Sequence, residues 1–188
     1  MTQMQAASGE ATMDSNQALG TFQKQAGGAL DLRFERRYPR AIEKVWSALT
    51  EPQRLAEWMG AARVEPRVGG LIELILDSEQ PMSGRVLAWQ APTLLEFTWS
   101  NGDAPDSIVR YELSRDGQGT KLVFTHKGVP YASSARMLPG WHVLFARLGS
   151  QLDSGKSQPP PSWRAMQASY VEAYQLTGVA LEVPARQR

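Results

Sequence analysis

The sequence contains no cysteine, which excludes thiol nucleophiles, zinc–thiolate sites, iron–sulfur clusters and disulfide bonds. Histidine is scarce as well: His126 and His142 are the only two, and neither has an acidic residue three or four positions further on. The spacing of a recognisable metal site is therefore missing, and we expect no metal and no other cofactor. A chain without cysteine is also typical of the cytoplasm.

Long hydrophobic runs and an excess of one charge are missing too. No apolar stretch approaches the roughly 20 residues that cross a bilayer, so we expect no membrane span. Residues 1–27 lack both the basic start and the continuous apolar block of a secretory signal, which again favours a cytoplasmic protein. The 20 basic residues are balanced by 19 acidic ones. A general phosphate-binding surface, and with it a nucleic-acid partner, is therefore not expected.

What the chain does have is enough apolar material for one core. Of its 188 residues, 42% are hydrophobic, and a domain of this size removes on the order of 70% of its unfolded surface from water. We expect a flexible, polar tail over residues 1–17 and the folded domain over residues 18–155. Residues 156–188 should form a proline-rich linker, a short helix packed back on the domain, and a loose end.

The first elements should be a hairpin and two short helices. Apolar residues occupy every second position from Leu30 to Phe34, which predicts strands over residues 19–24 and 29–38 around a glycine turn. After Pro39, apolar residues recur at helical spacing and predict an amphipathic helix over residues 42–49. Thr50 and Gln53 fit a capping box, so we expect a second helix that carries Leu55 and Trp58.

The period then changes to two for nearly 70 residues. Strands are expected at residues 62–66, 71–77, 83–90, 94–100, 107–115 and 120–127. Short turns separate them, among them Asn101-Gly102 and Asp116-Gly117, so neighbouring strands should be antiparallel. On several strands every second residue is apolar and the residues between are mixed, which predicts a sheet with one face covered by other parts of the protein. Glu96 and Arg110 should pair across the other face.

Two helices should follow the sheet. Trp141, Leu144, Phe145 and Leu148 form one apolar stripe over residues 138–152, where Ser133 or Pro139 would begin or bend the helix. This helix should cover the apolar face of the sheet. A last helix is expected over residues 163–175, after a proline-rich break; it is too short to build a core of its own.

The order of these elements and several blocks of residues resemble the SRPBCC, or START-like, superfamily. The blocks are RFERRYPRAIEKVWSALTEP (33–52), WMG (58–60), RVGG (67–70), SGRVL (83–87), LEFTW (95–99), GTKLVFTH (119–126) and PGWHVL (139–144). Within the superfamily, the chain resembles the branch named after the C-terminal domain of the activator of the Hsp-ninety ATPase (AHSA-like). The resemblance implies an α+β helix-grip fold, in which a curved antiparallel sheet wraps a long C-terminal helix.

The resemblance also implies a pocket between the sheet and that helix, where many relatives bind hydrophobic small molecules. We expect the pocket wall to consist of the large inward side chains and one histidine: Trp58, Met59, Phe97, Trp99, Tyr111, Phe124, His126 and Trp141. Each of them, taken alone, is more often an ordinary core residue. His126 shares the parity of Leu122 and Phe124, so it should point inward and need a hydrogen-bond partner. His142 should face the rim.

One local basic excess stands out around the start of the first predicted helix. It consists of Arg33, Arg36, Arg37, Arg40 and Lys44. Some of these side chains could steer an anion. Glu35 and Glu43 interrupt the series, and we therefore favour a solvated surface.

Three functional hypotheses follow. The first is a binding protein, monomeric or homodimeric, for a hydrophobic or lipid-like small molecule. The second is an enzyme that uses the same pocket, cyclase-like or hydrolase-like, with His126 as acid or base and Tyr111 as its hydrogen-bond partner. The third is an interaction module linked to a chaperone, which would need a contiguous exposed apolar patch. We favour the first, because no motif of a common catalytic site is present.

Overall fold

The computed structural model describes residues 18–76, 81–100, 106–154 and 159–176. Eight strands form a single curved sheet: β1 (Thr21–Lys24), β2 (Leu30–Tyr38), β3 (Ala61–Val64), β4 (Leu71–Ile75), β5 (Met82–Gln90), β6 (Leu94–Trp99), β7 (Ser107–Asp116) and β8 (Gly119–Val129). Their order is β1-β2-β8-β7-β6-β5-β4-β3, and every neighbouring pair is antiparallel. The sheet predicted from the period-two pattern is confirmed.

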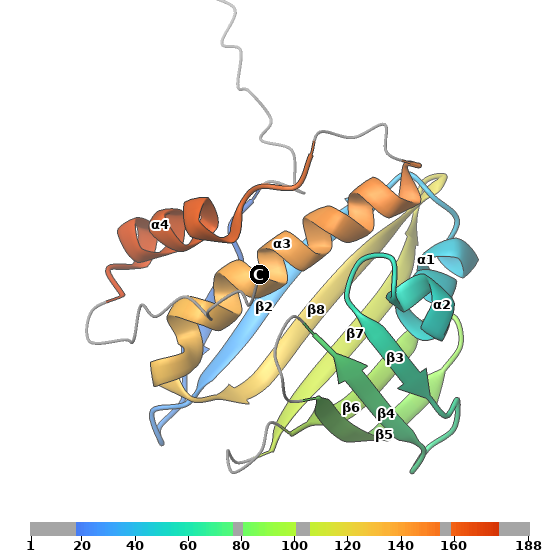
Figure 1. Ribbon diagram of the computed structural model, residues 1–188, viewed down its shortest axis with the longest axis horizontal. Helices are drawn as coiled ribbons and strands as arrows, with labels where there is room; N and C mark the ends of the chain where they lie inside the picture. The colour runs from blue at the N-terminus through green and yellow to red at the C-terminus, as the bar shows by residue number, and fades with distance from the viewer. Residues whose placement is uncertain (1–17, 77–80, 101–105, 155–158, 177–188) are drawn as a thin grey trace, which may run out of the picture.

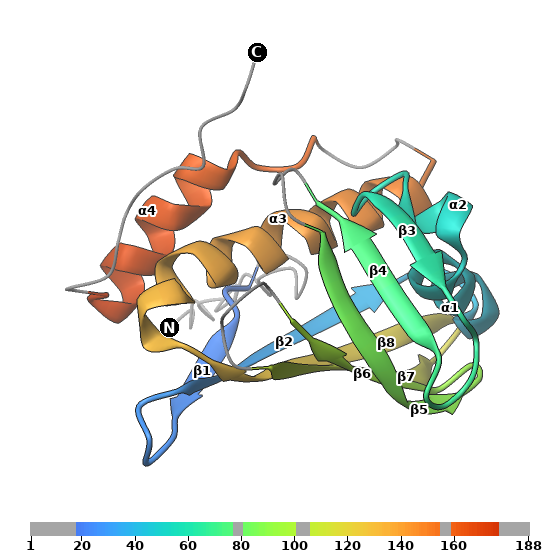
Figure 2. The same ribbon diagram turned by 60° about the horizontal axis from the view of Figure 1, so that its bottom comes forward.

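The sheet bends where its register shifts. One irregularity lies in the β2–β8 pair between Leu30 and Leu32, and another in the β5–β6 pair between Val86 and Ala88. Bulges of this kind sharpen the local twist of a strand pair. Figure 2 shows the result: β3, β4 and β5 curl up at one end of the sheet toward the long helix.

The two short helices sit between β2 and β3. Helix α1 (Ile42–Thr50) packs against β7 and β8, and α2 (Pro52–Leu55) packs against β3. The predicted capping box is wrong. Thr50 is the last residue of α1, and its hydroxyl donates to the carbonyl of Trp46 in the same helix (2.8 Å). Helix α2 begins at Pro52 and has no side-chain cap. Proline fixes the backbone angle that a helix start needs, so no cap is required.

Helix α3 (Ser134–Leu152) crosses the concave face of the sheet (Figure 1). It starts four residues earlier than predicted, after a short 3-10 turn at Tyr131–Ser133, and Pro139 lies inside its first turns. Its buried stripe includes Leu138, Trp141, Phe145 and Leu148, so the helix covers the apolar face as expected.

Helix α4 (Trp163–Tyr174) lies beside α3, on the side away from β3–β6 in Figures 1 and 2, and packs on it. The helix predicted over residues 163–175 is confirmed. The predicted tail over residues 1–17, the Asn101-Gly102 turn and the predicted loose end beyond residue 176 lie outside the described residues. None of the helices in the described ranges is long and apolar enough to span a membrane.

Candidate functional site: the buried aromatic cluster

The inward face of the central strands is built by alternation. In β6, β7 and β8 the buried positions are every second residue, and they include Phe97, Trp99, Tyr111, Phe124 and His126. Antiparallel pairing puts these side chains side by side, because Tyr111 opposes Phe124 and Val109 opposes His126 in the β7–β8 register. The parity predicted from the sequence is therefore confirmed.

Six of the eight predicted pocket residues form one connected set of rings, which we call the aromatic cluster: Phe97, Trp99, Tyr111, Phe124, His126 and Trp141. Trp141 of α3 is its centre. Its ring centroid lies 4.4 Å from that of Phe124, 5.2 Å from Trp99 and 5.8 Å from His126. Edge and tilted contacts of this kind stabilise beyond the area that they bury.

Two rings outside the predicted pocket wall also contact the aromatic cluster. Phe145, one helical turn after Trp141, lies 5.8 Å from its ring and 5.0 Å from Phe124, and Phe34 of β2 lies 5.5 Å from Phe145. Phe145 belongs to the apolar stripe predicted for α3. Its spacing of four residues from Trp141 puts both rings on the same helix face, and this signal could have added Phe145 to the aromatic cluster.

The other two predicted residues, Trp58 and Met59, are buried in the same hydrophobic core as this set. The indole Nε1 of Trp58 donates to the carbonyl of Ala48 in α1 (2.9 Å), and its ring makes no ring–ring contact with the aromatic cluster in the described part of the chain. Both follow α2, and the hydrogen bond to Ala48 ties Trp58 to α1. Their predicted role as pocket wall stays a prediction.

A chain of hydrogen bonds fixes the proton on His126. The indole N–H of Trp141 can only donate, and it points at Nδ1 of His126 (3.1 Å). In the neutral ring Nδ1 must therefore accept, and the proton sits on Nε2. Nε2 then donates to Oγ of Ser107 (2.8 Å), which in turn donates to the carbonyl of Trp99 (3.2 Å).

The direction of these hydrogen bonds decides whether His126 can activate Ser107 as a nucleophile. A serine is activated when a histidine accepts its proton, whereas here His126 donates to Ser107. If the hydrogen bonds ran in the opposite direction, His126 would carry its proton on Nδ1, and this N–H would face the N–H of Trp141. Burial also lowers the pKa of His126 to about 3, so the ring stays neutral at pH 7. Both of its nitrogens are occupied, and the arrangement serves to hold α3 on the sheet.

Two polar atoms on this covered face have no hydrogen-bond partner within the described part of the chain. One is the indole Nε1 of Trp99, and the other is the hydroxyl of Ser134, the first residue of α3. Ser134 lies seven residues before Trp141, two turns along the same face of α3. An unpaired buried donor costs roughly 1–3 kcal/mol, so such atoms are rare and call for an explanation.

His142 does not face the rim as predicted. It is buried, and its Nδ1 lies 3.1 Å from the hydroxyl of Tyr170 in α4. That hydroxyl accepts from the backbone N–H of Gly20 (2.7 Å) and can donate to His142. Burial, with a smaller contribution from the charge of Arg36, lowers the pKa of His142 to about 4. The prediction failed because α4 covers this side of α3.

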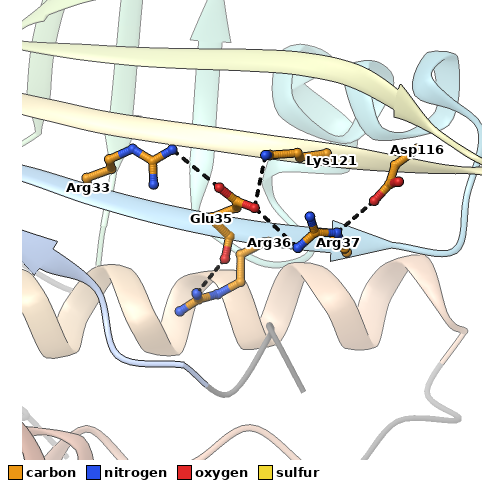
Figure 3. A network of polar contacts seen from close by, with 6 residues as sticks. All are labelled: Arg33, Glu35, Arg36, Arg37, Asp116 and Lys121. Carbon is orange, nitrogen blue, oxygen red and sulfur yellow. Dashed lines mark hydrogen bonds and ion pairs between the residues drawn. The ribbon is translucent and has the colours of Figure 1, made fainter. Parts of the chain in front are cut away.

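The prediction that the basic series forms a solvated surface is wrong for Arg36. Arg36 has only 2% of its side chain exposed, because it shares the inward parity of Leu32, Phe34 and Tyr38 in β2. Arg33 and Arg37 point to the other face, where both contact Glu35 (Figure 3). Within the described ranges no three His, Asp or Glu side chains come together in a way that could hold a metal ion.

These features define a class of protein: an α+β fold in which a curved antiparallel sheet grips a long helix over an aromatic interior. The model of one family, the Activator of Hsp90 ATPase homolog 1-like proteins, matches residues 39–153. The chain belongs to this SRPBCC-like family. No curated protein is similar enough to be matched.

Solved structures share the fold. CalU16 from Micromonospora echinospora is 27% identical, with a TM-score of 0.67 over 84% of this chain and 94% of its own. DynU16, described as a putative protein in the dynemicin biosynthetic locus, is 26% identical, with a TM-score of 0.62 over 67% of this chain and 48% of its own. A conserved protein of unknown function from Enterococcus faecalis, EF2215, superposes with a TM-score of 0.70 at 20% identity, over 83% of this chain and 90% of its own.

Proposed function

We propose that this chain binds a small hydrophobic molecule between the sheet and α3, and that the molecule carries a hydrogen-bond acceptor such as a ketone oxygen. The observation that carries the proposal is the indole N–H of Trp99 inside the aromatic cluster, which has no hydrogen-bond partner among the described residues. A core that only had to be stable would gain from phenylalanine at this position, since phenylalanine leaves no donor unpaired. A ligand oxygen would give the N–H its partner.

The side chains around Trp99 would suit an aromatic ligand. The ring of Trp99 meets Trp141 edge-on at 5.2 Å and His126 at 5.4 Å, so the donor sits among aromatic faces and edges. Such sites bind flat apolar molecules and use a few polar atoms to orient them. The location of the DynU16 gene in a biosynthetic locus agrees with a small organic ligand for this family.

Catalysis has less support from the same geometry. His126 was the candidate acid or base, but both of its ring nitrogens are engaged, and its low pKa prevents it from taking up a second proton at neutral pH. The hydroxyl of Tyr111 lies in the same interior, where burial raises its pKa, so it can donate a hydrogen bond and does not ionise. Binding without a proton-transfer step is the function that these groups favour.

A chaperone-linked interaction module also has less support. The exposed large hydrophobic side chains in the described ranges are Val68, Ile75 and Leu87. Val68 and Leu87 are neighbours, because Gly69 and Val86 pair beside them, while Ile75 lies at the other end of β4. They do not form one contiguous patch of the size that marks a protein interface.

The test compares two tricyclic probes that differ at one group. Xanthone has a ring ketone and xanthene has a methylene in its place. We expect saturable binding of xanthone by isothermal titration calorimetry, and about 5–10-fold weaker binding of xanthene, the equivalent of one hydrogen bond. In Trp99→Phe the two probes should bind with equal affinity.

Trp89→Phe is the matched control, since Trp89 contacts Trp46 outside the aromatic cluster; it should keep the preference for xanthone. Absence of saturable binding for both probes in the wild-type protein would contradict the proposed pocket for ligands of this size. A preference for xanthone that survives in Trp99→Phe would show that another group binds the oxygen.

A further inference from the structure

The backbone of Trp99 is fixed at the end of β6. Trp99 is the last residue of this strand and opposes Ser107, the first residue of β7. The hydroxyl of Ser107 donates to the carbonyl of Trp99 (3.2 Å). This side-chain hydrogen bond adds to the pairing of the two strands, and it holds the backbone from which the indole of Trp99 projects.

The indole ring of Trp99 is fixed as well, because it contacts two rings that are joined to each other. Its centroid lies 5.2 Å from that of Trp141 and 5.4 Å from that of His126. The rings of Trp141 and His126 lie 5.8 Å apart and stand at 85° to each other. The hydrogen bond from Nε1 of Trp141 to Nδ1 of His126 (3.1 Å) fixes that angle. The three rings form a triangle, in which a rotation of Trp99 would push against both neighbours.

His126 takes part in both restraints on Trp99. Its Nε2 binds the Ser107 hydroxyl that holds the backbone of Trp99 (2.8 Å), and its Nδ1 binds the Trp141 indole that packs on the ring. The side chain of His126 is fully buried, so water does not compete for either bond. A neutral imidazole accepts at one nitrogen and donates at the other. Phenylalanine in its place would keep a ring and lose both bonds.

A donor that is held in one direction favours the ligands that can use it. The indole N–H of Trp99 has no hydrogen-bond partner among the described residues. If the ring is fixed before a ligand arrives, little rotamer freedom is lost on binding. A ligand without an acceptor leaves the buried N–H unpaired, because the fixed ring cannot turn it toward another group. Rigidity therefore increases the difference in affinity between ligands with and without an oxygen at that position.

We infer that His126 is a positioning residue for the site proposed at Trp99, and that it sets the preference of this site for ligands with a hydrogen-bond acceptor. The inference rests on the proposed function. His126 acts through Ser107 and Trp141, since these residues engage both of its nitrogens. It selects an apolar molecule with a ketone oxygen over a molecule of the same shape with a methylene group in its place.

The first experiment needs no ligand. The indole N–H signal of Trp99, assigned by its absence in Trp99→Phe, is followed by ¹⁵N relaxation in the free protein. In the wild type we expect an order parameter near that of rigid backbone, about 0.85. His126→Phe should lower it by at least about 0.1. The indole N–H of Trp89, which contacts Trp46 outside the aromatic cluster, should keep its value.

The second experiment compares xanthone and xanthene by isothermal titration calorimetry. His126→Phe should reduce the wild-type preference for xanthone from about 5–10-fold to less than about twofold, while the affinity for xanthene changes little. His126→Gln should keep at least half of the preference, because its amide oxygen can accept from Trp141 and its amide N–H can donate to Ser107. A purely structural role would weaken both probes alike.

His142→Phe is the matched control. It makes the same substitution at the other buried histidine, whose Nδ1 faces Tyr170 outside the aromatic cluster, and it should leave the preference for xanthone unchanged. Ser107→Ala keeps the test valid if His126→Phe disturbs folding. It removes the group that links His126 to the carbonyl of Trp99, and it should lower the preference at least about twofold.

An order parameter and a preference that stay at their wild-type values in His126→Phe, or in Ser107→Ala, would overturn the inference. Equal weakening of both probes would overturn it too. A lower order parameter in His126→Phe, combined with a wild-type protein that does not distinguish the two probes, would refute the proposed function alone. The positioning of Trp99 by His126 would then still be supported.

Discussion

At the scale of single residues, two glycines of this chain should respond to the same substitution in opposite directions. Gly84 in β5 is buried, and a Cβ there would overlap the backbone carbonyl of Thr98 in β6. Gly84→Ala should lower the free energy of unfolding by about 1–3 kcal/mol, since backbone at the centre of a sheet cannot move aside cheaply. Gly140 in α3 has open space around its Cβ position, and Gly140→Ala should raise that free energy by about 0.5–1 kcal/mol.

Urea denaturation followed by far-ultraviolet circular dichroism would measure both changes. An equal loss in the two variants would show that the close approach of β5 and β6 carries no special constraint.

At the same scale, the burial of several strand residues could be predicted from the sequence alone. Strand parity predicted that Phe97, Tyr111 and His126 would be buried together, because alternation along one strand fixes the face of each side chain. Parity carried the same signal for Arg36, but the prediction treated the whole basic series as solvated because Glu35 and Glu43 interrupt it. The partners of His126 and His142 could not be predicted, since they come from α3 and α4 and depend on how two helices pack.

At the scale of helices and strands, the local sequence pattern gave a wrong prediction at the boundary between α1 and α2. The pattern from Thr50 to Gln53 fits a capping box, yet the preceding helix takes up Thr50 as its last residue. A hydroxyl at a junction can cap the next helix or bond back to its own. The choice depends on how α1 packs on the sheet, which is a tertiary effect.

The docking of α4 can be tested by removing single hydroxyl groups. The hydroxyl of Tyr170 is fully buried and bonds both Gly20 and His142. Tyr170→Phe leaves both partners buried without it and should lower the free energy of unfolding by about 2 kcal/mol. Tyr174 is only partly buried and makes one such bond, to the carbonyl of Gly20, so Tyr174→Phe should cost less than about 1 kcal/mol.

Amide hydrogen exchange gives a second measurement of the same contact. The N–H of Gly20 donates to Tyr170, so its protection should fall in Tyr170→Phe and stay high in Tyr174→Phe. The same loss of protection in both variants would mean that the two tyrosines hold the segment before β1 as one unit.

At the scale of the whole molecule, the two histidines make stability depend on pH. Both are buried inside the fold, and their pKa values are lowered from 6.5 to about 3 for His126 and about 4 for His142. The unfolded chain takes up these two protons as the pH falls through 6.5, while the folded chain does not. The contribution of the two histidines to the free energy of unfolding is therefore fully present above pH 6.5 and is lost as the pH falls toward their folded-state pKa values of about 4 and about 3.

The window between pH 6.5 and pH 5 isolates the histidines, because the ordinary pKa of the carboxyl groups lies lower and that of Glu35 is lowered further. In this window we expect the free energy of unfolding to fall by at most about 1.4 kcal/mol per pH unit for each histidine. The groups that face His142 are Arg36 from β2, whose charge opposes protonation, and Tyr170 from α4. His142→Gln should therefore remove about half of the slope. Urea denaturation of both proteins at pH 7.5, 6.5, 5.75 and 5 measures it, and a wild-type stability that stays constant over this range would mean that the histidines take up protons without the fold opening.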